Sequence, residues 1–239
     1  MIERSETTDM INVLFMLTFI VGLALTLWAQ WRVRGNFDRW SRVAARSGLT
    51  GAEVARRILD ANGLHHVPVQ MVPGRLSDHY DPIAPAVRLS ESVYHSHSIA
   101  AISVAAHECG HALQHKEAYG ALVLRHRMVP LLNITSGAAP FLLFAGVAFR
   151  MAGLLLLGLV FFSTVVLFHL VTLPVEFNAS ARAKKIMAQQ GFISGAEEER
   201  GVRRVLGTAA FTYVAGALVA LMELLKYVVL LFFQTNNDD

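Results

Sequence analysis

The stretch INVLFMLTFIVGLALTLWAQW, residues 11–31, contains no charged side chain. As a helix it would extend about 31 Å, enough to cross a bilayer core of about 30 Å. Trp28 and Trp31 close the run, where aromatic side chains suit a membrane–water interface. The preceding residues 3–9 are mostly acidic, unlike the basic start of a secretory signal. We therefore expect a transmembrane helix that is retained in the mature protein.

Three further apolar runs follow, and they predict three more transmembrane helices. Residues 129–149 are interrupted by the small and polar residues that transmembrane helices use where they pack closely. Residues 151–173 are more apolar, and only Arg150 separates the two runs, which indicates a tight hairpin. The fourth run, residues 205–233, contains Glu223 and Lys226. We expect these two to pair locally or Lys226 to reach the outer interface; a functional intramembrane pair is the alternative.

The composition excludes several other classes of protein. Of 239 residues, 54% are hydrophobic and 16% are charged, against about 25% charged in soluble domains. The single cysteine, Cys109, cannot form an internal disulfide, and we expect a small buried thiol. The pI of about 9.2 reflects basic residues that flank the apolar runs. With no nucleic-acid-binding signature present, we expect the lipid bilayer, and no nucleic acid, as a partner.

The basic residues also predict the orientation of the chain. All 21 Lys and Arg residues except Arg4, Arg150 and Lys226 would lie on one side of the membrane, which is cytoplasmic by the positive-inside rule. We therefore expect an integral protein of the bacterial inner membrane. The predicted layout is an external segment (1–10), helix 1 (11–31), a cytoplasmic domain (32–128), helices 2 (129–149) and 3 (151–173), a cytoplasmic segment (174–204), helix 4 (205–233) and an external tail (234–239).

The polar part of the chain predicts a small α+β domain. Thr50 and Glu53 form a capping box that opens an amphipathic helix ending at Asn62-Gly63. Residues 67–72 and 86–89 resemble short strands separated by turn-forming residues. The alanine-rich segment 98–127 returns to helix.

The main chemical signal is His107-Glu108-Cys109-Gly110-His111. Histidines four positions apart project from one face of a helix, so both imidazoles can reach one metal ion. Glu108 lies beside the first histidine, where such hydrolases place the base that takes a proton from water. The pattern therefore predicts a zinc site with Glu108 as the catalytic residue.

A catalytic zinc usually takes a third protein ligand. The metzincin spacing fails because position 117 is Glu117, and the short thermolysin-like spacing falls on Leu131 within an apolar run. His115 lies about 12 Å beyond His107 along the helix, so we favour a packing or supporting role for it. Glu176 is the best candidate. The His107 helix leads into helix 2 from the cytoplasmic side, and the hairpin of helices 2 and 3 returns the chain to that side just before Glu176.

These residues resemble a known family. The stretches 78–82 (DHYDP), 88–90 (RLS), 98–115 and 173–180 (LPVEFNAS) are similar to bacterial membrane-bound neutral zinc metallopeptidases of the YugP type. The resemblance runs from about residue 48 to the fourth apolar run. It implies a mainly α membrane protein with a zincin-like domain, zinc held by His107 and His111, and catalysis by Glu108.

The resemblance also implies a gluzincin arrangement, in which a Glu on a later helix is the third ligand and corresponds to Glu176. Two positions depart from the pattern. Gluzincins often place Asp four residues after this Glu to orient a ligand histidine, and here Ser180 stands there. Asn178 stands where Asp is expected more often.

The predicted function is a zinc-dependent membrane endopeptidase acting on a peptide or membrane-protein substrate at the cytoplasmic face. A zinc-activated water would lose its proton to Glu108 and attack the scissile carbonyl. The strand at 86–90 could pair with an extended substrate, or it could be an ordinary strand of the sheet. Five side chains could stabilise the oxyanion: Tyr80, His79, Tyr94, His97 and Arg182.

Two alternatives stay open at the sequence level. An intramembrane site-2-type protease would need its metal helix inside the bilayer, but only about nine uncharged residues follow Ser98, too few to span it. A non-catalytic membrane adaptor would need a fourth protein ligand and no open position, and His115 or Asp81 could supply one.

Overall fold

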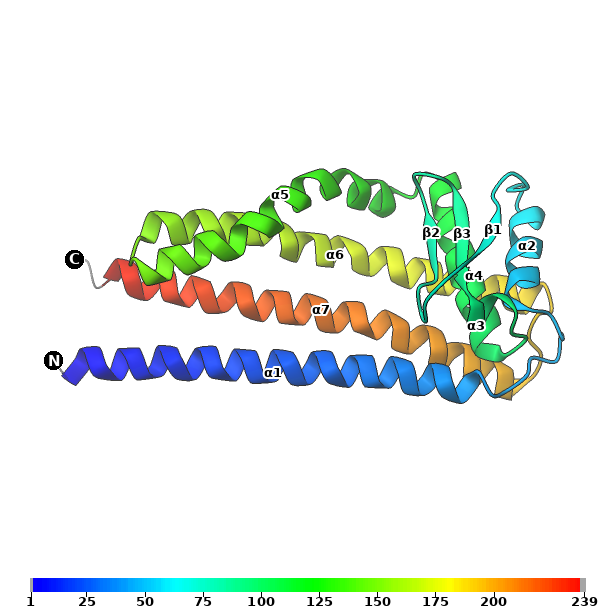
Figure 1. Ribbon diagram of the computed structural model, residues 1–239, viewed down its shortest axis with the longest axis horizontal. Coiled ribbons are helices and arrows are strands. Elements are labelled where there is room, and N and C mark those ends of the chain that lie inside the picture. The colour runs from blue at the N-terminus through cyan, green and yellow to red at the C-terminus, as the bar shows by residue number, and fades with distance from the viewer. Residues whose placement is uncertain (1, 237–239) are drawn as a thin grey trace. The chain divides into compact units, whose positions relative to one another are not determined.

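The computed structural model describes residues 2–236, with side chains described for residues 10–235. Residue 1 and residues 237–239, at the extremes of the expected external segments, lie outside the described residues. The chain is mainly helical and has a three-stranded sheet (Figure 1). Four of the described helices are long and apolar enough to cross a membrane. They are α1 (Ile2–Trp40), α5 (Gly120–Ala148), α6 (Ala152–Gln189) and α7 (Ala196–Asn236).

The described helices extend well beyond the predicted apolar runs. In particular, α6 continues through Pro174 and carries residues 174–189 as helix. The fold divides into two compact units. One unit comprises Ala29–Val123 and Leu173–Thr212, and the other contains the remaining, largely apolar parts of the four long helices.

In the apolar unit, α5 and α6 form the expected hairpin at Arg150, whose φ of 53° closes the turn. Glycines let the two helices approach closely. A Cβ at Gly158 would lie 2.9 Å from the backbone nitrogen of Leu143. Thr135 Oγ1 also bonds Thr164 Oγ1 across the pair. Thr135, one of the polar residues that interrupt the second apolar run, therefore contributes to helix packing.

Lys226 pairs with Glu223 in the same unit, as expected for a local interaction. Its ammonium also lies 4.5 Å from the ring centroid of Phe15 and 4.7 Å from that of Tyr227. The Lys226 residue is only 6% exposed, so a local ion pair and two aromatic rings compensate the buried charge.

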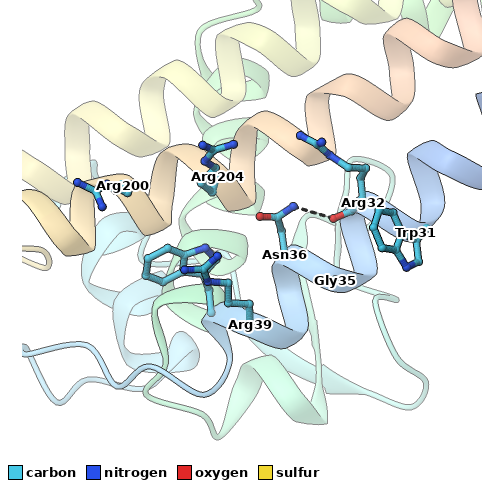
Figure 2. A pocket seen from close by; sticks show the side chains of 8 residues that line it. Trp31, Arg32, Gly35, Asn36, Arg39, Arg200 and Arg204 are labelled. Carbon is cyan, nitrogen blue, oxygen red and sulfur yellow. Dashed lines mark hydrogen bonds between the residues drawn. The ribbon is translucent and has the colours of Figure 1, made fainter.

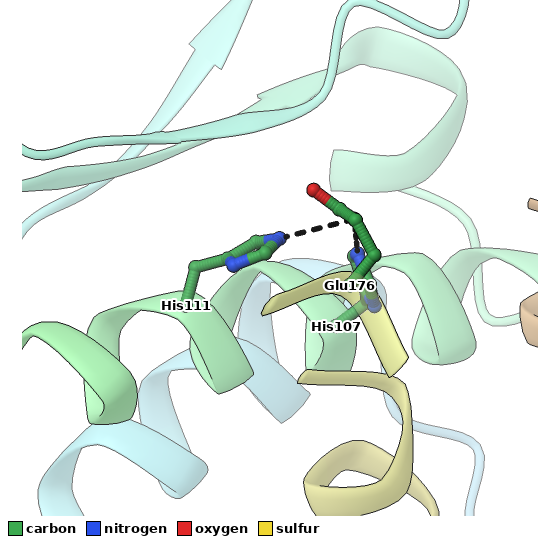
Figure 3. Close-up of side chains that lie close together, drawn as sticks. All are labelled: His107, His111 and Glu176. Carbon is green, nitrogen blue, oxygen red and sulfur yellow. Dashed lines mark ion pairs between the residues drawn. The ribbon is translucent and has the colours of Figure 1, made fainter. Parts of the chain in front are cut away.

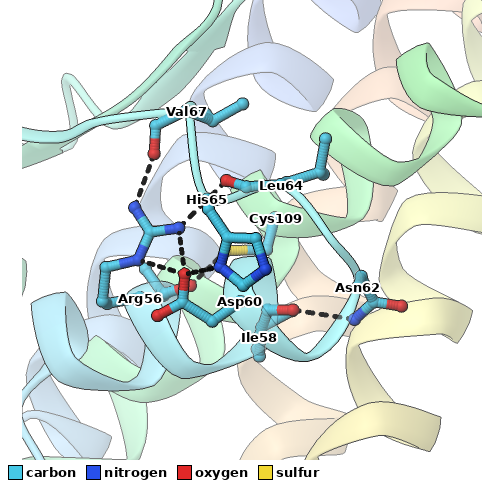
Figure 4. Close-up of polar contacts among 9 residues, drawn as sticks. Arg56, Ile58, Asp60, Asn62, Leu64, His65, Val67 and Cys109 are labelled. Atoms are coloured by element: carbon cyan, nitrogen blue, oxygen red, sulfur yellow. Dashed lines mark hydrogen bonds and ion pairs between the residues drawn. The ribbon is translucent and has the colours of Figure 1, made fainter.

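The other unit contains the sheet and the short helices. The capping box forms as predicted: Thr50 accepts from Glu53 N and Glu53 accepts from Thr50 N at the start of α2 (Gly51–Ala61). After α2, Arg56 holds the following loop by donating to Leu64 O and Val67 O, while Asp60 pairs with Arg56 and His65 (Figure 4). This loop leads into β1 (Val69–Val72).

The sheet has the strand order β1-β3-β2. Strand β3 (Ala86–Ser90) is parallel to β1 and antiparallel to β2 (His79–Asp81), with Tyr80 opposite Val87. The prediction of a turn-rich segment missed β2, because a three-residue strand is too short to show a period in sequence. Strand β3 is also central and paired on both sides, so the substrate-pairing interpretation of residues 86–90 is wrong and the ordinary-strand interpretation holds.

Residues of the stretches 78–82 (DHYDP) and 88–90 (RLS) hold β2 and β3 together. Asp78 accepts hydrogen bonds from Ser90 N at 2.7 Å and from Ser90 Oγ. Asp81 pairs with Arg88 at 2.7 Å and accepts from Ile83 N and Ala84 N in the turn. These contacts give the DHYDP and RLS stretches a structural role.

Helix α4 (Ile99–Lys116) follows the short helix α3 (Glu91–Tyr94) and contacts α2, α3, β2 and β3. Its alanines and Ile102 are buried in the core of the unit, together with Ile58 of α2 and Leu89 of β3. Ser98 caps the helix by accepting from Ala101 N. The core therefore fixes the helix that carries the HExxH pattern.

The predicted continuous helix 98–127 is wrong at residues 117–119. Ala118 adopts a left-handed conformation with a φ of 49°, and α5 begins at Gly120. The N–H groups of Ala118 and Tyr119 donate to His115 O and Gln114 O, which satisfies the carbonyls at the helix end. Position 118 lacks the glycine that usually marks such a turn, so the turn could not be predicted from the residue type.

Candidate metal centre

The metal-binding candidates come from two helices of one unit. His107 and His111 lie on α4, and Glu176 lies on α6 one turn beyond the apolar run (Figure 3). Glu176 Oε2 is 3.3 Å from His107 Nε2 and 3.6 Å from His111 Nε2. One ligand atom from each residue lies within 4.8 Å of the others. The three side chains therefore face one point.

The chemistry of this donor set fits zinc. Two imidazole nitrogens and one carboxylate oxygen are the ligands of many catalytic zinc sites. Glu176 is 2% exposed, and the two histidine side chains are each 13% exposed. Among the described residues this group consists of three side chains. Three is the number of protein ligands that leaves the fourth position of a tetrahedral zinc site open.

The electrostatics of the group keep the carboxylate charged. Burial raises the pKa of the Glu176 carboxyl, but the nearby imidazoles of His107 and His111 outweigh burial, so its pKa lies well below the usual value. Burial lowers the pKa of His111, and the effects of Glu176 and Glu108 reverse this, so its pKa is raised. An ionised carboxylate facing two imidazoles is suited to a divalent cation.

Gly110 sets the separation between α4 and α6. A Cβ at this position would lie 2.7 Å from Ala179 O and 3.1 Å from Ala179 Cα. Both atoms belong to the backbone, so a larger residue can only be accommodated if the helices separate. Gly110, which directly precedes His111, therefore allows the close approach that places Glu176 within reach of the histidines.

Gly110→Ala should lower zinc affinity by at least about tenfold, because it separates the helices that carry the three ligands. Competition with a chromogenic chelator measures the effect. Gly207→Ala is the matched control, because Gly207 also lies within a long helix but a Cβ there meets no atom within 4 Å. Equal affinities in the two variants would contradict the proposed role of the close contact.

The second ring nitrogen of His111 is held by Gln114, which is fully buried. Gln114 Nε2 donates to Val175 O at 2.7 Å and to Asn178 Oδ1 at 3.0 Å. The Val175 carbonyl can only accept a hydrogen bond, so the Gln114 side-chain nitrogen must face it. The Gln114 side-chain oxygen is then the atom that faces His111 Nδ1, at 3.0 Å. His111 Nδ1 therefore carries a proton, which leaves Nε2 as the atom that would bind a metal ion.

The orientation of Asn178 is fixed in turn by Arg182. Arg182 Nε donates to Asn178 Oδ1 at 2.7 Å, and its guanidinium pairs with Glu117 at 2.7 Å. Asn178, a departure from the expected pattern, thus supplies the acceptor that orients Gln114. Arg182 supports this network, so its predicted role as an oxyanion donor gains no support.

Ser180, the other departure, lies beside His107. Its Oγ is 3.2 Å from His107 Nδ1, so the serine takes the place in which gluzincins often have an aspartate. A neutral hydroxyl can accept the Nδ1 proton without adding a negative charge. Sequence reasoning recognised this position but missed Gln114, whose signal is its place three residues after His111 on the same helix.

Ser180→Ala should lower zinc affinity by about tenfold, because His107 loses the partner that fixes its ring orientation. Ser103→Ala is the control: Ser103 is also fully buried, but it donates to Ile99 O within α4. Isothermal titration with zinc compares the two. An affinity unchanged in Ser180→Ala would exclude the orienting role.

The remaining candidates lie outside the group of three. His115 Nδ1 is 2.7 Å from the Tyr80 hydroxyl, which agrees with a supporting role. Asp81 is engaged with Arg88. His79 Nδ1 lies 2.8 Å from Ser77 O, and Tyr94 packs edge-on against His95. Cys109 is buried, its Sγ contacts Ala55 O at 3.5 Å (Figure 4), and burial raises the pKa of its thiol.

The fold and the site define a mainly α membrane protein with a metal centre of the zinc-peptidase type. The chain belongs to the family described as "Putative neutral zinc metallopeptidase", which matches residues 15–232. It is 56% identical over 226 residues to the "Putative membrane protease YugP" of Bacillus subtilis (strain 168), which covers 95% of this chain and 99% of that protein. No solved structure matches the chain. The resemblance to the YugP-type metallopeptidases, inferred from the sequence, is therefore confirmed. Zinc is the cofactor that the family and the donor set support.

Proposed function

We propose that the protein is a zinc-dependent endopeptidase that uses His107, His111 and Glu176 as metal ligands and Glu108 as general base. The observation that carries the proposal is the convergence of these three ligand atoms within 4.8 Å. It is supported by membership of a zinc-peptidase family and by a 56% identical relative named as a membrane protease.

In this proposal, zinc supplies Lewis acidity that activates water and polarises the scissile carbonyl. Glu108 follows His107 on α4 and is 7% exposed, and its charge contributes to the raised pKa of His111. Its carboxylate accepts the proton of the attacking water and passes it to the leaving amine. Gln114 and Ser180 contact the Nδ1 atoms of His111 and His107, which leaves the two Nε2 atoms as the ones that would hold the ion.

The experiment that tests the reaction is metal removal and restoration on the full chain in detergent. Casein cleavage should stop after chelation and return when zinc is added, while the thermal unfolding of the chelated protein shows that the fold survives. An adaptor that retains metal only for folding would show no cleavage at any stage. The group of three ligands, with His115 and Asp81 outside it, favours the catalytic alternative.

We further propose that the site faces the cytoplasm at the surface of the inner membrane. The basic residues around the site support this orientation by the positive-inside rule. The metal helix α4 is not among the described helices suited to cross a membrane, which disfavours a site-2-type intramembrane protease. A cysteine-labelling experiment tests the orientation: Ser92→Cys in the Cys109→Ala background should react with an impermeant maleimide only after cells are opened.

A further inference from the structure

A hollow of about 540 Å³ lies between α1 and α7 in the same unit as the metal centre, but is lined by different residues (Figure 2). Four arginines line it, two from each helix, and no lining residue described by the structure is acidic. The lining residues are Trp31, Arg32, Gly35, Asn36, Arg39, Trp40, Arg200 and Arg204. This is a strongly basic hollow with aromatic side chains.

Three carboxylates close to the hollow in sequence, Asp38, Glu198 and Glu199, have partners that do not line it. Asp38 on α1 pairs with Arg75. On α7, Glu198 accepts from Arg46 N at 2.7 Å and from Ser194 N at 2.6 Å, and Glu199 pairs with Arg203. Bringing several guanidinium groups to one hollow is repulsive unless an anion neutralises them. The hollow is therefore suited to an anionic ligand.

The sequence positions of the residues that line the hollow indicate the source of the anion. Trp31 is the last residue of the apolar run 11–31, and Arg204 directly precedes the run 205–233. The arginines thus follow one membrane segment and precede another, at the level expected for lipid phosphates. Trp31 is 70% exposed, as expected for an aromatic side chain at the lipid interface.

We propose that this hollow binds the phosphate of an anionic phospholipid. Guanidinium groups donate paired hydrogen bonds to phosphate oxygens, and basic pockets beside membrane helices bind such headgroups. The bound lipid would link α1 to α7 at the membrane surface. The inference does not depend on peptidase activity, because none of the lining residues belongs to the metal group.

The test is native mass spectrometry of the full chain in detergent with phosphatidylglycerol or phosphatidylcholine of the same acyl chains. The wild type should retain phosphatidylglycerol in preference. Arg200→Gln/Arg204→Gln should weaken its binding roughly thirtyfold, at about 1 kcal/mol for each arginine. Arg39→Gln/Arg204→Gln, with one change on each helix, should show a similar loss.

Arg42→Gln/Arg203→Gln is the control, because it removes the same charge from two exposed arginines outside the hollow. It should bind phosphatidylglycerol as the wild type does. Equal binding of the two phospholipids, or the same loss in the control as in the hollow variants, would overturn the proposal. Displacement of the lipid by an equal concentration of inorganic phosphate would instead identify a soluble phosphate site and would also overturn it.

Discussion

Glu108→Gln should abolish most peptide hydrolysis while leaving zinc bound. The amide keeps the size of the carboxylate but cannot accept the proton of the attacking water, so kcat should fall by about 10²- to 10⁴-fold. The metal ligands are unchanged, so zinc content should stay at one ion per chain. Casein cleavage and elemental analysis on the same preparation separate the two effects.

The control for this variant is Cys109→Ala, one residue further along α4. Cys109 is fully buried and its thiol makes a weak contact with Ala55 O, so its loss should leave both zinc content and kcat within about threefold of wild type. If Glu108→Gln cleaved casein as fast as wild type with zinc bound, Glu108 would not be the general base.

Glu176→Ala should remove zinc binding at the concentrations at which wild type is saturated. The substitution takes away the carboxylate and leaves only the two imidazoles of α4, so affinity should fall by roughly a hundredfold or more, and hydrolysis should fall with it. Equilibrium dialysis against buffered zinc measures the loss directly.

Glu91→Gln is a suitable comparison, because it also removes a carboxylate from the same unit but lies exposed at the start of α3. It should bind zinc as wild type does. Retention of wild-type affinity by Glu176→Ala would show that the third ligand lies elsewhere, and His115 would then have to be tested.

Much of this arrangement could be predicted from sequence because its signals are strong and local. Apolar runs long enough to cross a bilayer predicted the apolar parts of four helices, and the capping box at Thr50 and Glu53 predicted the start of α2. The distant Glu176 could be joined to His107 because a hairpin of two membrane segments brings its ends back to one face. The topology of the hairpin was therefore enough to place Glu176 near His107 without knowledge of tertiary contacts.

Other features could not be predicted because tertiary contacts determine them. Ala118 takes a left-handed conformation without the glycine that usually announces it, and β2 is defined only by pairing with β3. Gln114 is an ordinary residue in sequence, and its role depends on Val175 and Asn178 from a different helix. Ser180 looked like a weakening departure, yet the structure places its hydroxyl beside His107.

The central claim is that His107, His111 and Glu176 share one zinc ion and leave a position open. Zinc-edge X-ray absorption on the full chain loaded with one equivalent of zinc tests it most directly. The account predicts two imidazole nitrogens and the remaining ligands as oxygen, at about 2.0–2.2 Å. A sulfur ligand, a third imidazole, or a spectrum unchanged in Glu176→Ala would contradict it.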